Sequence, residues 1–242
     1  DLNNKLNTVK QIYGAGQGYL GEEEQDLMQN RSYILVDVPQ TMTTYQGTEI
    51  FGAGESGGVG MGVDPATAAE PTTAHKASAI IDLLSGEVKA TYGGSYKEGI
   101  TRRTVVNVPT GSTIKLEKIF GGAYGVRNDV ACDVYESNVN WNSAEALVGN
   151  YKTGIYGGNN AYRRTLYGKV NISAPVYYDK ENEYYATVYG AGYGVDTWAQ
   201  YTEVNLNGNE DPTKDGAKVY EVYGGSQLGK VMNTNTVPLW KE

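Results

Sequence analysis

The chain has few of the residues from which disulfide scaffolds and many active sites are built. It contains 242 residues, a single cysteine, Cys132, and a single histidine, His75. One cysteine cannot form an internal disulfide, and one histidine cannot supply a zinc site with several histidines. No stretch approaches the roughly 18 consecutive apolar residues of a membrane-spanning helix. We therefore predict no membrane insertion, a buried Cys132 on a strand, and an exposed His75 in a loop.

Positive charge is also scarce. The 20 Lys and Arg residues are outnumbered by 28 Asp and Glu residues, which gives a net charge of -8. Nucleic acid requires a basic surface to neutralise its phosphates, and anionic membranes attract basic segments. The charge balance therefore argues against nucleic acid and anionic membranes as partners.

The chain is rich in glycine and tyrosine, with 32 and 21 residues, and it repeats one short phrase seven times. The phrase is an aliphatic residue or Thr, an aromatic residue, Gly, and then Ala or Gly. Successive phrases start 38, 41, 28, 36, 33 and 34 residues apart. A period of this size indicates a stacked array of repeats. The phrases begin at Ile12, Ile50, Thr91, Ile119, Ile155, Val188 and Val222.

Between the phrases, short apolar-polar alternations predict strands and leave no room for helices. The first strand of a repeat is expected at 33–38, 79–84, 104–108, 130–134, 169–173 and 203–207. Turn formers follow at 39–40, 85–86, 109–111, 174–175 and 207–208, and a second strand then leads back to the phrase at 86–92, 113–120 and 218–223. We predict an all-β fold: a single-stranded β-solenoid, in its commonest form a right-handed parallel β-helix of about seven rungs. Residues 1–242 would be one domain, and a segment of a longer surface protein.

In such a coil, equivalent side chains of successive rungs lie above one another. The aliphatic position of the phrase would form a ladder in which Thr91 is the only polar member. The aromatic position would form a second ladder that shields the corners. The first glycine of each phrase, as at Gly121 and Gly157, is expected to adopt the positive φ of a sharp corner.

The chain contains no complete motif for binding a nucleotide or calcium, and no informative motif for glycoside hydrolysis. Two stretches, 16–21 and 52–57, match the spacing of a dinucleotide-binding loop, but the residues after them cannot form the helix that would hold a pyrophosphate. A calcium-binding nonapeptide has a carboxylate where this chain has Gly62. With 28 acids, a pair of carboxylates at glycosidase spacing carries no information. We assign no catalytic residue, no metal ligand and no cofactor.

Tyrosine supplies the main candidate binding residues. Its clusters exceed what a core requires, and a tyrosine ring can stack on a sugar ring at small entropic cost. The candidates are Tyr177, Tyr178, Tyr184, Tyr185 and Tyr193.

Two arginines complete the set. Arg127, Arg163 and Lys230 each lie eight residues after the start of a phrase, and Arg102-Arg103-Thr104 resembles Arg163-Arg164-Thr165. Stacked, these residues could form a basic stripe that holds an acidic glycan. The alternative is simple ion pairing with nearby acids such as Asp129.

The repeated phrase, with segments such as Thr-Val-Val-Asn-Val at 104–108 and Lys-Val-Asn-Ile-Ser at 169–173, resembles the repeats of large surface proteins of Bacteroidota. Those proteins are right-handed parallel β-helices described as adhesin-like or pectate-lyase-like. The resemblance implies an extracellular or cell-surface location and a polysaccharide or a surface protein as partner. It transfers no catalytic residue, and the long segments 18–30 and 54–76 depart from it.

We therefore expect an adhesive or scaffolding module that binds glycan or protein. The alternative is a carbohydrate-active enzyme of the stacked-rung type, either a polysaccharide lyase or a glycoside hydrolase. Parallel strands leave unpaired edges at both ends of the array, so end-to-end contacts with further solenoid are also expected.

Overall fold

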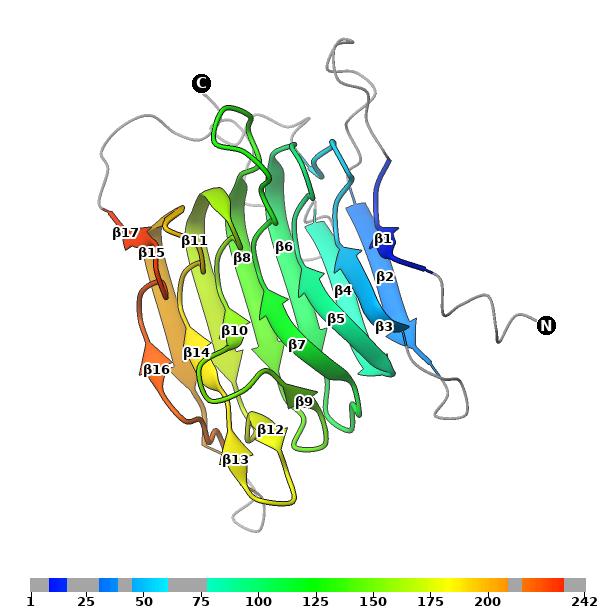
Figure 1. The fold of residues 1–242 in the computed structure, drawn as a ribbon, viewed down its shortest axis with the longest axis vertical. Coiled ribbons are helices and arrows are strands. Elements are labelled where there is room, and N and C mark those ends of the chain that lie inside the picture. Colours follow the sequence, from blue (N-terminus) through cyan, green and yellow to red (C-terminus); the bar gives the residue numbers. More distant parts are fainter. Residues whose placement is uncertain (1–8, 17–30, 39–44, 61–77, 209–214, 233–242) are drawn as a thin grey trace, which may run out of the picture.

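The structure, a computed structural model, describes residues 9–16, 31–38, 45–60, 78–208 and 215–232. These residues form strands and no helix, so the all-β prediction is confirmed. The strands build two sheets that lie face to face (Figure 1). The turn predicted at Pro39, the exposed loop position of His75 and most of the two long segments lie outside the described residues.

Each sheet has a path of seven strands. Sheet 1 has the order β1 (Gln11–Tyr13), β3 (Tyr45–Phe51), β5 (Glu87–Tyr92), β7 (Lys115–Phe120), β10 (Gly154–Tyr156), β14 (Thr187–Tyr189) and β16 (Val222–Tyr223). Sheet 2 has the order β2 (Arg31–Asp37), β4 (Ser78–Ser85), β6 (Thr101–Val108), β8 (Val134–Trp141), β11 (Tyr162–Ile172), β15 (Asp196–Leu206) and β17 (Lys230–Val231). Three short strands, β9 (Leu147–Val148), β12 (Tyr177–Asp179) and β13 (Tyr184–Tyr185), extend sheet 1 beside this path.

The chain passes from one sheet to the other and back in every repeat. It runs, for example, from β5 in sheet 1 to β6 in sheet 2 and then to β7 in sheet 1. Neighbouring strands within a sheet path therefore come from consecutive repeats, and they pair in parallel. Among the described residues, β12 and β13 pair antiparallel as a hairpin, and an isolated antiparallel bridge joins Asn150 and Thr153.

The register places the seven phrases directly above one another. Ile119 pairs with Thr91 on one side and with Ile155 on the other, and the same alignment continues to both ends of sheet 1. These side chains point between the sheets, where they pack against residues of sheet 2 such as Val106 and Val139. The predicted aliphatic ladder is confirmed, including Thr91 as its polar member.

The aromatic position of the phrase forms the predicted second ladder. Because side chains alternate along a strand, these rings lie on the opposite face of sheet 1 from the aliphatic ladder. Neighbouring rings stack with centroids 4.7 to 5.1 Å apart. Tyr96, Tyr124 and Tyr193 from the following corners pack over them. The ladder consists of Tyr13, Phe51, Tyr92, Phe120, Tyr156, Tyr189 and Tyr223.

The phrase glycines are required for a different reason from the one predicted. Positive φ angles occur at other glycines, and within the described residues none of the phrase glycines has one. A Cβ at Gly121 would instead lie 2.9 Å from the carbonyl oxygen of Gly157 and 3.0 Å from Ser137 Oγ. The same collision with the next phrase glycine recurs from Gly14 to Gly190. Close approach of backbones, and not a left-handed corner, excludes a side chain here.

Hydroxyl groups of sheet 2 use the space that the glycines leave. They donate hydrogen bonds to the glycine carbonyls of the next repeat and so tie the two sheets together at the corner. The pairs are Ser32 with Gly52, Thr104 with Gly121, Ser137 with Gly157 and Thr202 with Gly224.

The sequence predicts the two ladders correctly, but it predicts the ends of the individual strands less well. The strand expected at 130–134 is wrong, because β8 begins at Val134 and Cys132 lies in the corner before it. The second strand expected at 218–223 is reduced to β16. The turns expected at Gly86 and Gly111 are confirmed by φ angles of 109° and 81°.

Candidate binding surfaces

The hairpin of β12 and β13 carries four of the predicted tyrosines as two ring pairs. Tyr177 stacks on Tyr185 with centroids 5.0 Å apart, and Tyr177 is buried. Tyr178 and Tyr184 lie 5.7 Å apart with an interplanar angle of 31°. Tyr184 is 53% exposed. The first pair is therefore part of the body, whereas the second pair presents ring surface to solvent.

Two further tyrosines, which the sequence reasoning missed, adjoin the exposed pair. Tyr151 lies in the turn between β9 and β10, and Tyr220 precedes β16. Their rings meet edge to face at 6.1 Å, and they are 48% and 56% exposed. Burial raises the pKa of Tyr178, and the charges of Tyr184, Asp179, Tyr151 and Tyr220 raise it further. We call Tyr151, Tyr178, Tyr184 and Tyr220 the tyrosine patch.

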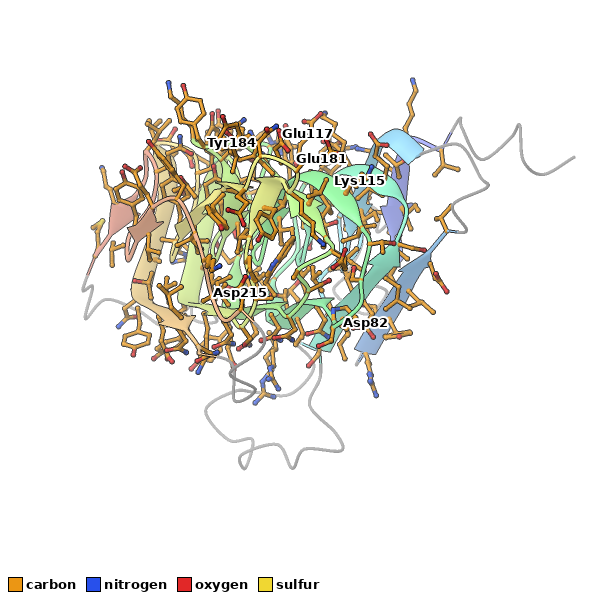
Figure 2. The ribbon with its side chains drawn as sticks, turned by 90° about the horizontal axis from the view of Figure 1, so that it is seen from below. Asp82, Lys115, Glu117, Glu181, Tyr184 and Asp215 are labelled. Carbon is orange, nitrogen blue, oxygen red and sulfur yellow. The ribbon has the colours of Figure 1, made fainter. Side chains whose placement is uncertain are left out.

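A signal for Tyr151 is present in the sequence. Tyr151 precedes the phrase at Ile155 by four residues, and Tyr184 precedes the phrase at Val188 by the same distance. Alignment on the phrase would have placed these two tyrosines in adjacent repeats. Figure 2 shows Tyr184 on the same side of the body as Lys115 and Glu117 of sheet 1, with Asp82 of sheet 2 on the opposite side.

Polar groups border the tyrosine patch. Lys152 Nζ lies 5.1 Å from the centroid of the Tyr151 ring. The carboxylate of Asp179 accepts hydrogen bonds from the side-chain and backbone N–H groups of Asn182, and these bonds lower the pKa of Asp179. Exposed aromatic faces next to fixed hydrogen-bonding groups are the combination that recognises a sugar, whose rings have apolar faces and a rim of hydroxyl groups.

Tyr193, the fifth predicted tyrosine, belongs to a different cluster. Its ring meets Tyr156 edge to face at 5.8 Å in the layer that covers the aromatic ladder. Lys118 Nζ lies 4.5 Å from the centroid of the Tyr193 ring, and burial lowers the pKa of Lys118. The structure therefore does not bring Tyr193 into the tyrosine patch.

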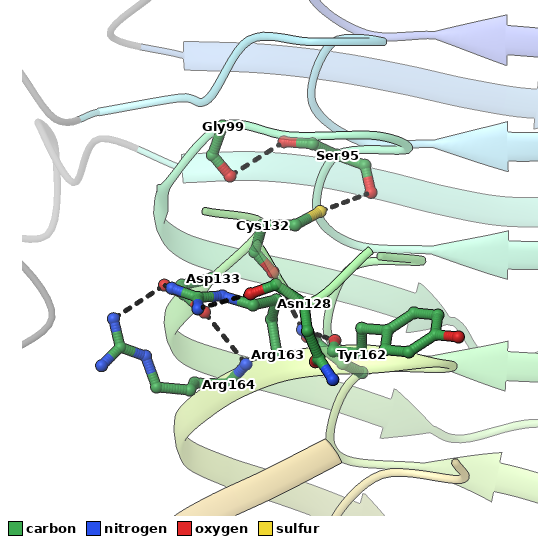
Figure 3. A network of polar contacts seen from close by, with 9 residues as sticks. Ser95, Gly99, Asn128, Cys132, Asp133, Tyr162, Arg163 and Arg164 are labelled. Carbon is green, nitrogen blue, oxygen red and sulfur yellow. Dashed lines mark hydrogen bonds and ion pairs between the residues drawn. The ribbon is translucent and has the colours of Figure 1, made fainter. Parts of the chain in front are cut away.

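Arg163 lies in a buried ion network (Figure 3). Its Nη2 is 3.0 Å from Asp133 Oδ2, and Nη2 of Arg164 is 2.9 Å from the same oxygen. The backbone N–H of Arg164 donates to Asp133 Oδ1. The Asp133 side chain is completely buried, and a buried charge requires partners of this kind. Arg163 also donates to the carbonyl of Asn128.

Cys132 lies beside Asp133 in this corner (Figure 3). It is also completely buried. Its thiol contacts the Ser95 carbonyl, and burial raises its pKa to about 12. A thiol with so high a pKa carries little thiolate at neutral pH, so it is a poor nucleophile. The corner that holds Cys132 and the Asp133 network is therefore part of the framework of the fold.

The register does not assemble the predicted basic stripe. Arg127 lies outside the strands and pairs with Asp129 at 3.3 Å on the exposed surface. Lys230 aligns with Trp198 and, through it, with Arg164, so it does not stack on Arg163. The resemblance between the two Arg-Arg-Thr segments is likewise not structural, because Arg103 aligns with Glu136 and Tyr167.

The outer face of sheet 2 carries a ladder of asparagines that was not predicted. Asn140, Asn171 and Asn205 each donate from Nδ2 to the Oδ1 of the preceding asparagine, at 2.8, 2.8 and 2.9 Å. Asn107 begins the ladder and donates to Asp82 at 2.7 Å. The amides therefore satisfy one another along the strands.

A groove of about 250 Å³ crosses the outer face of sheet 1. Its charged lining alternates in sign, with Glu87 opposite Lys115 in the register and with Lys89 and Glu117 beside them. In the part of the chain that the structure describes, no three His, Cys, Asp or Glu residues are grouped so that they could hold a metal ion.

Two further findings concern the chain as a whole. Among the described residues there is no helix that is both long and apolar enough to cross a membrane. Comparison with known proteins finds no family model, no curated protein and no solved structure that matches this chain.

Proposed function

We propose that the alternation of strands between the two sheets is the coil of a β-solenoid, a right-handed parallel β-helix. Three observations support it: the parallel pairing of consecutive repeats, the two ladders of like side chains, and the return of the chain to each sheet once per repeat. Parallel strand crossovers in one sheet are almost always right-handed, which gives the handedness.

On this body, we propose, the chain acts as an extracellular or cell-surface module that binds glycan. The observation that carries the proposal is the tyrosine patch. Tyr151, Tyr184 and Tyr220 each leave about half of their surface in water, although a β-rich body could bury such rings. Rings held in fixed positions lose little entropy when a sugar stacks on them. Asp179, Asn182 and Lys152 would then hydrogen-bond to its hydroxyl groups.

The patch also has the support that a binding site needs. Tyr178 packs against the main core, and the Thr187 hydroxyl donates to the Tyr151 carbonyl at 2.7 Å, which fixes the turn. The Asp179 carboxylate is anchored within the hairpin by Asn182. These contacts hold Tyr178, the backbone of Tyr151 and the Asp179 carboxylate in place, and such preorganisation favours binding.

A second candidate function, a carbohydrate-active enzyme, rests on the groove of sheet 1. Glu87 and Glu117 both line it, and two carboxylates are what glycoside hydrolysis requires. Against it, the register sets Glu87 opposite Lys115, so that charge is balanced across the groove. We therefore prefer the binding function.

The test is binding of the whole chain to a panel of neutral and acidic polysaccharides, measured by affinity electrophoresis. Replacing both Tyr184 and Tyr220 with Ala should weaken binding to the preferred polysaccharide by about tenfold or more. The matched control is Tyr201→Ala on the outer face of sheet 2, where the ring is also 53% exposed and lies 6.1 Å from that of Tyr167. It should bind like the wild type.

Equal loss in the control, or no retention on any polysaccharide, would contradict the proposed site. Release of new reducing ends or of unsaturated products during the assay would favour the enzyme instead. In that case Glu117→Gln should abolish the release and leave retention unchanged.

A further inference from the structure

The last phrase of the chain keeps a glycine for which the structure gives no reason. From Gly14 to Gly190, a Cβ on the phrase glycine would collide with the carbonyl oxygen of the next phrase glycine. At Gly190, for example, it would lie 2.6 Å from Gly224 O. Among the described residues, a Cβ at Gly224 itself would meet nothing within 4 Å. The position is built as though another repeat followed it.

The hydrogen bonds end at the same point. The N–H of Gly121 donates to the Tyr156 carbonyl at 2.8 Å, and that of Gly190 donates to the Tyr223 carbonyl at 2.8 Å. Within the described ranges, the Gly224 N–H meets no such backbone carbonyl. Val222 and Tyr223 are 39% and 44% exposed, although their equivalents Val188 and Tyr189 are buried. In the described part of the chain, no further repeat therefore continues either ladder of sheet 1 beyond β16.

The N-terminal end of the same chain presents the matching half. β1 carries Ile12 and Tyr13 at the end of the strand order of sheet 1, and Gly14 and Ala15 follow the strand and complete the phrase. Beside it, an apolar hollow of about 160 Å³ opens into the core, lined by Ile12, Ile34 and Ile50 among others. An aliphatic side chain such as that of Val222 fits this lining.

We propose that the N-terminal end of a second copy of this chain stacks on the C-terminal end of the first, with β1 following β16 and β2 following β17. The alternation between sheets continues unbroken, because the described chain starts in sheet 1 and ends in sheet 2. Gly224 N–H then donates to the carbonyl of Tyr13 of the second copy. The carbonyl of Gly14 of that copy lies in the space where a Cβ on Gly224 would be.

This contact joins different surfaces of the two copies, so each copy keeps one free end. Such heterologous contacts propagate into open chains and do not close into dimers. Assembly through the two ends of the array is independent of glycan binding at the tyrosine patch.

The first test is sedimentation velocity of the full chain over a concentration series. The wild type should associate reversibly, and Gly224→Val should weaken the association by about tenfold or more. Gly208→Val is the matched control, because a Cβ at Gly208 also meets no atom of the described residues within 4 Å. It should associate like the wild type. Both variants should keep the wild-type Tm, because neither fills occupied space.

The second test separates the two ends. Tyr13→Asp places a charge at the N-terminal end of the aromatic ladder and should block that end only. Each blocked variant alone should stay monomeric, whereas a mixture of Tyr13→Asp and Gly224→Val should form one-to-one dimers. A wild type that stays monomeric would overturn the proposal, and so would a Gly224→Val variant that associates like the wild type. A folded mixture without dimers would overturn it as well.

Discussion

At the residue scale, the phrase glycine shows how one atom can decide whether two backbones approach each other. The sequence correctly marks Gly121 as demanding, because no larger residue occurs at this position of the phrase. It suggests a positive φ, since that is the commonest reason for glycine at a corner. The actual reason, the Gly157 carbonyl of the next repeat, is visible only once the repeats are stacked.

We predict that Gly121→Ala lowers the free energy of unfolding by about 1–3 kcal/mol, the usual cost of overpacking. The added Cβ would press on backbone at 2.9 Å, and backbone has little freedom to move away. Chemical denaturation measures the loss. Gly111 is not a suitable control position, because its φ of 81° would strain any larger residue. Gly208→Ala is the control: its Cβ meets no atom of the described residues within 4 Å, so it should change stability little. Equal losses at positions 121 and 208 would contradict the explanation.

Thr91 is the polar member of the aliphatic ladder. Burying its hydroxyl group costs free energy that no hydrogen bond to the described residues offsets. It lies completely buried between Ile50 and Ile119, and its Oγ1 has no hydrogen-bond partner among the described residues. Thr91→Val replaces the hydroxyl with a methyl group of similar size, so we expect it to stabilise the fold by about 1 kcal/mol.

The control for Thr91 is Thr104→Val in sheet 2. The Thr104 hydroxyl is also buried, but it donates to the Gly121 carbonyl at 2.5 Å. Its loss should destabilise the fold by about 1 kcal/mol, because the carbonyl loses its partner. Denaturation midpoints that shift in the same direction in both variants would count against this assignment.

At the element scale, the columns of equivalent residues could be predicted from the sequence, and the corners could not. The phrase determines which residues align, because parallel pairing places equivalent residues of successive repeats beside one another. The strand expected at 130–134 failed for a physical reason. Asp133 alternates with Cys132 and Val134 as a strand residue would, but its buried carboxylate binds Arg163 and Arg164 from the next repeat. Such a partner, about thirty residues away, leaves no local pattern.

The candidate site was predictable to a similar extent. Clustering in sequence identified Tyr178 and Tyr184, which share a hairpin. Tyr151 and Tyr220 reach them only through stacking of repeats. Tyr193 was misleading because an aromatic residue in a corner can equally well cover the aromatic ladder. The basic stripe failed because equal spacing from the phrase does not ensure equal register once the corners differ in length.

The aromatic ladder, as an element, predicts that the fold weakens in alkali. Burial, more than any neighbouring charge, raises the pKa of Tyr13 to about 12. It also raises the pKa values of Tyr92 and Tyr156 above the ordinary value of 10.0. Above about pH 10 the unfolded chain releases these protons, whereas the folded chain retains them. Since the unfolded state then binds fewer protons, stability is complete below about pH 10 and falls as pH rises towards 12.

Denaturation midpoints at pH values between about 8 and 11 measure this loss. Tyr92→Phe is the matched variant, because phenylalanine already occupies the same column at Phe51 and Phe120. The variant should lose less stability in alkali than the wild type. An identical decline in both proteins would show that the alkaline loss arises from other groups.

At the scale of the whole molecule, the two ladders make the body a rigid support whose surface can vary from repeat to repeat. Core and ladder residues recur at every turn of the chain, whereas corners differ in length and content. The tyrosine patch uses that freedom, because its members come from the turn before β10, the hairpin and the approach to β16. In repeat proteins of this kind, insertions commonly gather on one binding face.

The same regularity explains why the ends matter. A stacked array has no closed surface at its first and last repeats, so its edges must be covered or extended. In this chain the C-terminal edge retains both ladders and the phrase glycine to its last described repeat.

The most direct test of the account concerns the stacking of repeats, on which the patch and the open ends both depend. It is a nuclear Overhauser spectrum of the chain with labelled isoleucine and valine methyl groups. Cross-peaks should join Ile119 to Ile155, and Ile155 to Val188, in the order of the aliphatic ladder. A folded protein in which these pairs show no cross-peaks would contradict the stacked arrangement.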